Sequence, residues 1–150
     1  MEIPENALNR LARGTVKPGE VYRMKLTREE GITPKNPGDE SRNKYFIVMG
    51  TKSDGSIIGV TVINSEVNRN IPKLLQKYHY PISADKYPFL EKDRYVCCNR
   101  MLPIKTEKFF SSTNKTFVGT IDEVDLEIIR AIMADSGLIP VALMREFDII

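Results

Sequence analysis

The stretch from Lys44 to Ser65 constrains the fold more than any other part of this 150-residue chain. It reads KYFIVMG, then the polar TKSDGS, then IIGVTVINS, so two runs of β-branched and aromatic residues flank a turn at Asp54 and Gly55. Runs of this kind around a glycine-containing loop predict a β-hairpin. Because the apolar residues are nearly continuous rather than alternating, we expect other parts of the chain to cover both faces of this hairpin.

Polar residues mark the ends of the predicted hairpin. Arg42 and Lys44 stand where the first strand begins, and Asn64 and Ser65 stand where the second strand ends. In an antiparallel pair the start of one strand lies beside the end of the next. We therefore expect the two cations and the two small hydrogen-bonding side chains to meet at one end of the sheet, which is the best candidate site in the sequence.

The composition is that of an ordinary globular domain, with 41% hydrophobic and 28% charged residues. No apolar run reaches membrane-spanning length, and the N-terminal MEIPENALNRLARG lacks the apolar centre of an export signal. We therefore expect a cytoplasmic protein without membrane association. The net charge of +2 is compatible with RNA binding but does not require it.

The only two cysteines, Cys97 and Cys98, are adjacent. Neighbouring side chains on a strand point to opposite faces, so we expect one cysteine in the core, the other on the opposite face, and no disulfide between them. A single histidine and the lack of a CxxC motif leave too few ligands for a metal site. We expect neither a metal nor any other cofactor.

The chain divides into an N-terminal leader, residues 1–16, and one domain, residues 17–150. The leader predicts a short amphipathic helical turn with Leu8 and Leu11 on one side. In the domain we expect strands at 19–26 and 94–99 and a long, mobile surface loop at 27–43. Two segments leave alternatives open. Residues 66–80 predict either a helical turn starting near Pro72 or a strand stopping at Pro81, and the tail from residue 141 predicts a last strand or a docked arm.

The clearest helix signal begins at Thr120, where TIDE has the pattern of a capping box that pairs Thr120 with Glu123. Gly137 and Pro140 end the helix. We expect its buried face to carry Ile121, Val124, Ile128, Ala131 and Ile132. Short strands at intervals followed by this helix predict a mainly β fold, a small barrel-like sheet with long loops and one C-terminal helix.

The order of these pieces resembles the MazF/PemK family of bacterial toxins, the growth inhibitors of toxin–antitoxin pairs. The segments that carry the resemblance span residues 17–139 and are GEVYRMKL, KYFIVMG, VTVINS, RYVCCNRMLPIKTEKF and VGTIDEVDLEIIRAIMADSGLI. The resemblance implies an SH3-like barrel of the CcdB–PemK type. It also implies a homodimeric, metal-independent endoribonuclease that cuts single-stranded RNA and is held by a cognate antitoxin protein.

The resemblance places the family's catalytic arginine on Lys44 and its catalytic threonine on Asn64, with Ser65 next to it. Lysine keeps the positive charge but lacks the bidentate fork of arginine, and asparagine forms hydrogen bonds but is no acid or base. The family's acidic residue falls on Asn99, and its second arginine falls on Leu102, close to Arg100. The residues expected to be catalytic are thus Lys44, Asn64 and Ser65.

Arg42, Asn99, Arg100 and His79 are expected to contact RNA. His79 is flanked by tyrosines, which suits base stacking or proton transfer, although a packed histidine in an aromatic strand is an alternative. These substitutions at the family's catalytic positions leave two hypotheses open. The chain is either an RNA-cleaving toxin or a non-cleaving member of the same fold that binds nucleic acid or a protein.

Overall fold

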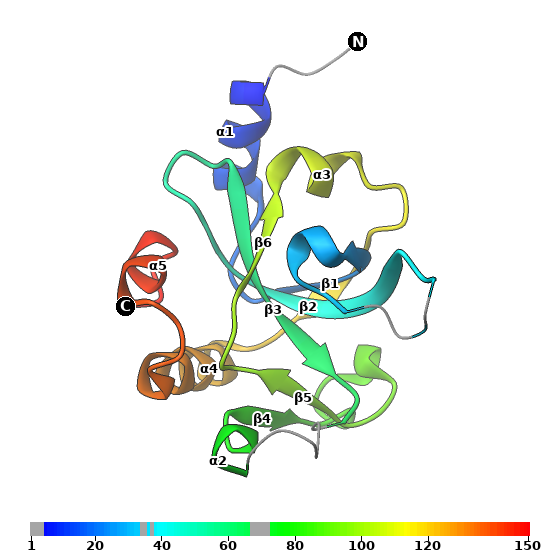
Figure 1. Ribbon diagram of the computed structural model, residues 1–150, viewed down its shortest axis with the longest axis vertical. Helices are drawn as coiled ribbons and strands as arrows, with labels where there is room; N and C mark the ends of the chain where they lie inside the picture. Colours follow the sequence, from blue (N-terminus) through cyan, green and yellow to red (C-terminus); the bar gives the residue numbers. More distant parts are fainter. Residues whose placement is uncertain (1–4, 34–35, 37, 67–72) are drawn as a thin grey trace.

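A computed structural model describes residues 5–33, 36, 38–66 and 73–150 of the chain (Figure 1). Its seven strands form one antiparallel sheet in the order β4-β5-β3-β2-β1-β7, and β6 pairs with a second segment of β3. The strands are β1 Glu20–Thr27, β2 Ser41–Thr51, β3 Ile57–Asn64, β4 His79–Ile82, β5 Arg94–Cys97, β6 Leu102–Lys105 and β7 Thr116–Thr120. The predicted mainly β class is confirmed, but the described strands form an open sheet and not a closed barrel.

Helices accompany the sheet on both of its faces. They are α1 Glu5–Thr15, α2 Lys73–Gln76, α3 Thr106–Ser111, α4 Glu123–Ser136 and α5 Val141–Glu146, with short 3-10 turns η1 Arg28–Glu30 and η2 Pro88–Leu90. In Figure 1, α1 and α3 lie together at one end of the molecule, whereas α4 and α5 lie on another side. No helix in the described ranges is long and apolar enough to cross a membrane.

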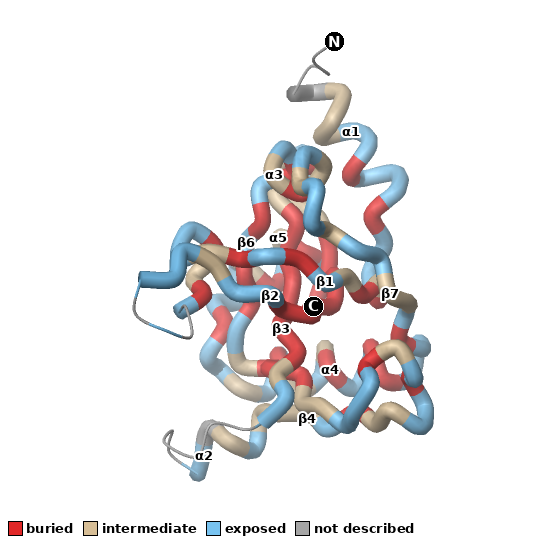
Figure 2. The backbone as a smooth tube through the Cα atoms, turned by 90° about the vertical axis from the view of Figure 1, so that its right-hand side faces the viewer, coloured by how far each residue is buried: buried red, intermediate tan, exposed pale blue. Residues whose placement is uncertain are grey.

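The hairpin of β2 and β3 is confirmed as the centre of the sheet. Asp54 and Gly55 form its turn, in which Gly55 takes a φ of 77° and the Asp54 carboxylate accepts the backbone N–H of Ser56 at 2.9 Å. The backbone residues from 44 to 50 and from 58 to 63 are all buried. The expectation that both faces are covered is therefore confirmed, and Figure 2 shows this buried hairpin between exposed outer segments.

The two faces of the sheet belong to two separate apolar clusters. One joins the strands to α4 and α5 through Leu126, Ile129, Met133, Met144 and Phe147. The other joins the opposite face to α1 and α3 through Ala12, Val16 and Phe109. Cys98 belongs to the first cluster and Cys97 to the second, and both are free thiols, so the prediction for the cysteines is confirmed.

A pair of glycines in the hairpin makes room for the C-terminal segment. Gly50 lies opposite Gly59 in the register of β2 and β3. A Cβ atom on Gly50 would approach the Phe147 carbonyl oxygen to 2.5 Å, and one on Gly59 would approach the Phe147 ring to 2.9 Å. The prediction of a last strand in the tail is therefore wrong. The tail is a docked arm that contains the short helix α5, and Phe147 packs against the backbone of Gly50 and Gly59.

The predicted start of the C-terminal helix is wrong, and its predicted buried face is right only in part, because Ile121 is buried and Ile132 packs against the core. Thr120 ends β7 and pairs with Glu20, so the cap is instead Asp122, whose carboxylate accepts the N–H of Asp125 at 2.8 Å. In contrast to the prediction, Val124 is 66% exposed and Ile128 is 37% exposed. The buried helix residues are Asp125, Leu126, Ile129 and Met133.

The remaining differences concern segment lengths. The leader forms an 11-residue helix rather than one turn, and its buried side chain is Ala12, with Leu11 exposed. The loop expected at 27–43 is shorter, because β1 runs to Thr27 and β2 begins at Ser41; residues 34–35 and 37 of it lie outside the described part. Residues 73–82 contain both alternatives, the short helix α2 and the strand β4, whereas the expected start at Pro72 lies outside the described residues.

Candidate functional site

Lys44 and Asn64 meet at one end of the central hairpin, as the sequence predicts. Lys44 lies in β2, Asn64 is the last residue of β3, and the Lys44 ammonium donates a hydrogen bond to the Asn64 side-chain oxygen at 2.5 Å. Lys44 is only 9% exposed, so its aliphatic chain lies within the sheet end while its charge faces a neutral amide. No ion pair of Lys44 with a carboxylate is present among the residues described.

The surroundings of Lys44 make its ammonium a stronger acid than that of an ordinary lysine. Burial is the largest cause and, together with the positive charges of Arg42 and Arg94, lowers the pKa of Lys44 to about 8. Cys97 has a weaker effect in the opposite direction. A desolvated cation beside further cations and without a carboxylate partner is a favourable place for a phosphate group.

Asn99 and Arg100 lie on the same side of the sheet end as Lys44. The Cys97 thiol donates to the side-chain oxygen of Asn99 at 2.8 Å, and the Arg100 guanidinium donates to the Gly31 carbonyl oxygen. Burial raises the pKa of Cys97, while the nearby charges of Arg100 and Lys44 act to lower it. The positive charges of both residues thus act on one buried thiol, to which the sequence assigned no role in a site.

The other predicted site residues are more distant or make no contact. Arg42 is exposed two positions before Lys44 on the same strand, and Ser65 is exposed beyond the strand end without a hydrogen bond to the described residues. His79 pairs with Cys97 in the register of β4 and β5. It lies three strands from Lys44, about 14 Å at ordinary strand spacing, so it takes no part in the contact of Lys44 with Asn64. Its Nδ1 atom is buried and has no partner among the described groups.

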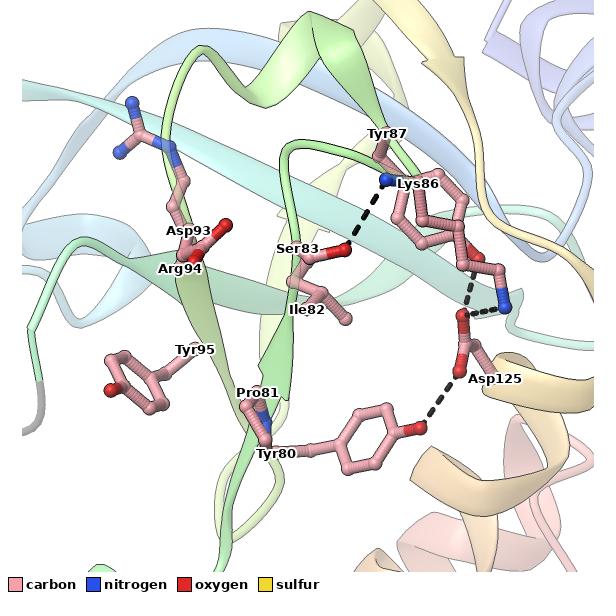
Figure 3. A pocket seen from close by; sticks show the side chains of 10 residues that line it. All are labelled: Tyr80, Pro81, Ile82, Ser83, Lys86, Tyr87, Asp93, Arg94, Tyr95 and Asp125. Atoms are coloured by element: carbon pink, nitrogen blue, oxygen red, sulfur yellow. Dashed lines mark hydrogen bonds and ion pairs between the residues drawn. The ribbon is translucent and has the colours of Figure 1, made fainter.

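A separate open cavity of about 330 Å³ lies at the edge of the sheet, where β4 and β5 approach the start of α4 (Figure 3). Its lining combines tyrosine rings with charged side chains, namely Tyr80, Pro81, Ile82, Ser83, Lys86, Tyr87, Asp93, Arg94, Tyr95 and Asp125. The sequence analysis assigned no site here. No local pattern in the sequence connects Asp122 and Asp125 with tyrosines in another segment.

Asp125 is the centre of a hydrogen-bonded network on one side of this cavity. Its carboxylate accepts the hydroxyl of Tyr80 at 2.7 Å and also the hydroxyl of Tyr87, and it forms an ion pair with Lys86 at 2.9 Å (Figure 3). Burial acts to raise the pKa of Asp125, but the hydrogen bonds outweigh it and the pKa is lowered. Because both carboxylate oxygens have donors, this network anchors α4 to the sheet rather than offering a reactive group.

Within the described residues no group of three or more metal-binding side chains gathers that could hold an ion. The cations at the sheet end form no ion pair with a described carboxylate, which leaves their charges available to an anionic ligand. Arg94 joins them as a residue that the sequence analysis missed, although its position at a strand start is the same signal that pointed to Lys44. Its guanidinium also stacks over the Tyr45 ring at 4.6 Å.

The comparisons with known proteins add no relative to this picture. No protein-family model matches the sequence, and the comparison with curated proteins gives no match either. The resemblance to the MazF/PemK family accordingly rests on the order of elements and on short residue patterns, and the functional argument rests on the site itself.

Proposed function

We propose that this protein binds single-stranded RNA at the Lys44 end of the sheet and cleaves it without a metal, as an endoribonuclease of the MazF/PemK toxin type. The observation that carries the proposal is Lys44 itself. It is nearly buried, bonded to the neutral side chain of Asn64, and its pKa is lowered to about 8. A structural lysine in a sheet is expected to reach water or a carboxylate, whereas this one holds an acidic ammonium beside other cations.

The proposed reaction is an attack of a ribose 2′-hydroxyl on the adjacent phosphorus. The new bond from the 2′-oxygen to phosphorus forms as the bond to the 5′-oxygen breaks, which leaves a cyclic phosphate on one fragment and a 5′-hydroxyl on the other. The 2′-hydroxyl proton passes to water. Lys44 donates a proton to the departing 5′-oxygen, and Arg42 stabilises the charge on the phosphoryl oxygens. Asn64 holds the Lys44 ammonium in place.

The architecture supports the proposal at a coarser level. The chain is mainly β, the long hairpin is central, and a helix follows the last strand, which is the order that the family resemblance implies. An SH3-like form of the open sheet, a homodimer and inhibition by a cognate antitoxin belong to the same proposal. The cytoplasm is the proposed compartment, in keeping with two free thiols.

A second candidate function is a non-cleaving RNA-binding module of the same fold. It is favoured by the lack of an evident proton acceptor near Lys44 among the residues that the structure describes. Asn64 and Asn99 are neutral amides, and burial raises the pKa of Cys97, so that this thiol stays protonated at neutral pH. In this alternative the cationic sheet end binds RNA but does not cleave it.

The test is incubation of the purified protein with a mixed-sequence single-stranded RNA, followed by primer extension to map cuts. We expect Lys44→Ala to reduce the cleavage rate by at least about tenfold, the effect of losing one charge-assisted hydrogen bond in the transition state. Lys52→Ala is the matched control, because Lys52 lies at the turn end of the hairpin and pairs with Glu146 at 3.5 Å. We expect the control to cleave at the parent rate.

The pH dependence gives a second measurement in the same assay. If the Lys44 ammonium is the acid, the cleavage rate falls as pH rises through about 8, where this group loses its proton. Cleavage that is unchanged in Lys44→Ala would remove Lys44 from the site. Binding without cleavage by the parent protein would favour the second candidate. A parent protein that neither binds nor cleaves RNA would contradict both candidate functions.

A further inference from the structure

Four side chains from four neighbouring strands form a row across the sheet at its cationic end. The Lys44 ammonium of β2 bonds to Asn64 of β3, Asn64 lies directly opposite Tyr95 of β5, and Tyr95 lies directly opposite Pro81 of β4. Directly opposed residues in antiparallel strands have their side chains on the same face. The row therefore places a cation, an amide, an aromatic ring and a proline side by side on one face.

Tyr95 is available to a ligand. It is half-buried, whereas Pro81 is exposed, and within the described ranges no hydrogen bond, ring contact or ion pair engages the Tyr95 side chain. Figure 3 shows Tyr95 and Tyr80 on opposite sides of Pro81, with Tyr80 directed to Asp125 and Tyr95 directed away from it. The Tyr80 side chain thus takes part in the contact with Asp125 of α4. The Tyr95 ring does not, although it contributes to the wall of the open cavity.

The spacing of this row matches the parts of one nucleotide. Two inter-strand steps separate Lys44 from Tyr95, about 10 Å at ordinary strand spacing. A phosphate at Lys44 leaves the attached ribose near Asn64, whose amide can bond to sugar hydroxyls, and brings the base to Tyr95. Single-stranded RNA is held by aromatic side chains on which unpaired bases stack, with cations along the backbone.

We infer that Tyr95 is the stacking platform for the base of the nucleotide whose phosphate is held at Lys44, and that Pro81 extends this platform to the sheet edge. The inference rests on the proposed RNA function and adds the direction of the substrate, which crosses the strands from β2 toward β4. It also assigns base stacking to Tyr95 instead of His79, the residue that the sequence suggested for that role.

The experiment measures binding of a short, fluorescently labelled RNA by anisotropy, with 2′-O-methyl riboses so that it cannot be cut. A companion RNA of the same length carries abasic sites in place of its bases. We expect Tyr95→Ala to weaken binding of the base-containing RNA by about tenfold and to leave binding of the abasic RNA unchanged. Tyr95→Phe should bind as the parent does, because the hydroxyl forms no hydrogen bond with the described residues. Lys44→Ala should weaken binding of both RNAs.

Phe117→Ala is the matched control, since Phe117 is an exposed aromatic residue on β7 at the opposite edge of the sheet. If circular dichroism shows that Tyr95→Ala is unfolded, Tyr95→Leu replaces it, because leucine keeps the apolar bulk but has no ring face. Equal affinity of the folded Tyr95 variant and the parent for the base-containing RNA would overturn this inference alone, provided that Lys44→Ala weakens binding. A parent protein that binds neither RNA would overturn the proposed function and the inference together.

Discussion

At the scale of single residues, Lys44 is in conflict with its surroundings. A charged ammonium that is nearly removed from water destabilises the folded state, and a neutral amide offsets that cost only in part. The two buried carboxylates of the described part have charged partners, since Glu30 pairs with Lys108 at 2.6 Å and Asp125 pairs with Lys86 at 2.9 Å. A destabilising choice of residue at one place in an otherwise well-packed sheet end indicates a role other than stability.

We expect Lys44→Met to raise the free energy of unfolding at neutral pH by about 1 kcal/mol, because methionine fills the same space without a buried charge. The pKa of Lys44 is lowered from 10.5 in the unfolded chain to about 8 in the folded protein. Between these values the unfolded chain binds more protons, so the stability of the parent rises with pH. The advantage of the variant is therefore complete below pH 8 and shrinks as pH rises further.

Urea unfolding of Lys44→Met and the parent across this pH range checks the prediction. Lys25→Met, a substitution of an exposed lysine on β1, serves as the control and should show no such pH dependence. A variant less stable than the parent at pH 7 would mean that the bond to Asn64 outweighs the burial of the charge.

At the scale of elements, α4 is held by polar as well as apolar contacts. Leu126, Ile129 and Met133 pack on the sheet, and Asp125 connects the helix start to β4 and to the segment before η2 through two tyrosine hydroxyls. This arrangement explains why a carboxylate lies on the buried face of α4. The anchor also defines one wall of the open cavity.

We expect Asp125→Ala to lower the free energy of unfolding by about 3 kcal/mol, because it leaves two tyrosine hydroxyls without their acceptor, whereas Lys86 keeps its ion pair with Asp122 at 2.7 Å. Tyr80→Phe removes a single hydrogen bond and should cost about 1 kcal/mol. The folded-state pKa of Asp125 lies below the ordinary 3.8, so this stabilisation is present above about pH 4 and is lost as pH falls through the folded-state value.

Denaturant unfolding of both variants at neutral and acidic pH measures these differences. The difference in the free energy of unfolding between Asp125→Ala and the parent should be smaller at acidic pH than at neutral pH. A gap of less than 1 kcal/mol at pH 7, or one that is independent of pH, would show that the apolar contacts of α4 suffice to hold it.

At the scale of the whole molecule, the low net charge limits the size of the proposed RNA contact. The net charge is only +2, and the cations at the sheet end are few, so a long electrostatic track along the surface is not expected. Arg42, Lys44 and Arg100 are the cations that the predicted site contributes. Each cation that neutralises one phosphate of a single strand adds about 0.7 to the slope of log K against log salt.

We expect RNA affinity to fall with salt with a slope of about −2, the effect of three neutralised phosphates. Lys44→Ala should reduce the magnitude of that slope by about 0.7, whereas Tyr95→Ala should lower affinity without changing it. Anisotropy titrations of the 2′-O-methyl RNA at several potassium chloride concentrations provide the measurement. Lys17→Ala serves as the control, and a slope unchanged in Lys44→Ala would contradict contact of this lysine with a phosphate.

Local patterns in the sequence determined the central hairpin, its covered faces, the opposite orientation of the two cysteines and the meeting of Lys44 with Asn64. Each of these features depends on the two-residue period of a strand or on the pairing of strands that are neighbours in the sequence. Both rules apply without the tertiary structure. The catalytic roles of Lys44, Asn64 and Ser65 stay predictions, and the RNA-binding roles of Arg42, Asn99, Arg100 and His79 do too.

Only the tertiary structure decided which face of α4 is buried, how the tail docks on Gly50 and Gly59, and which residues lie next to Asn64. The strand β3 pairs with β5 near one end and with β6 along the other, and these partners come from distant parts of the chain. Such pairings result from competition among many possible neighbours for the same edge and the same apolar area. No local pattern in the sequence predicts these pairings. For that reason the position of Tyr95 opposite Asn64 could be identified only in the folded sheet.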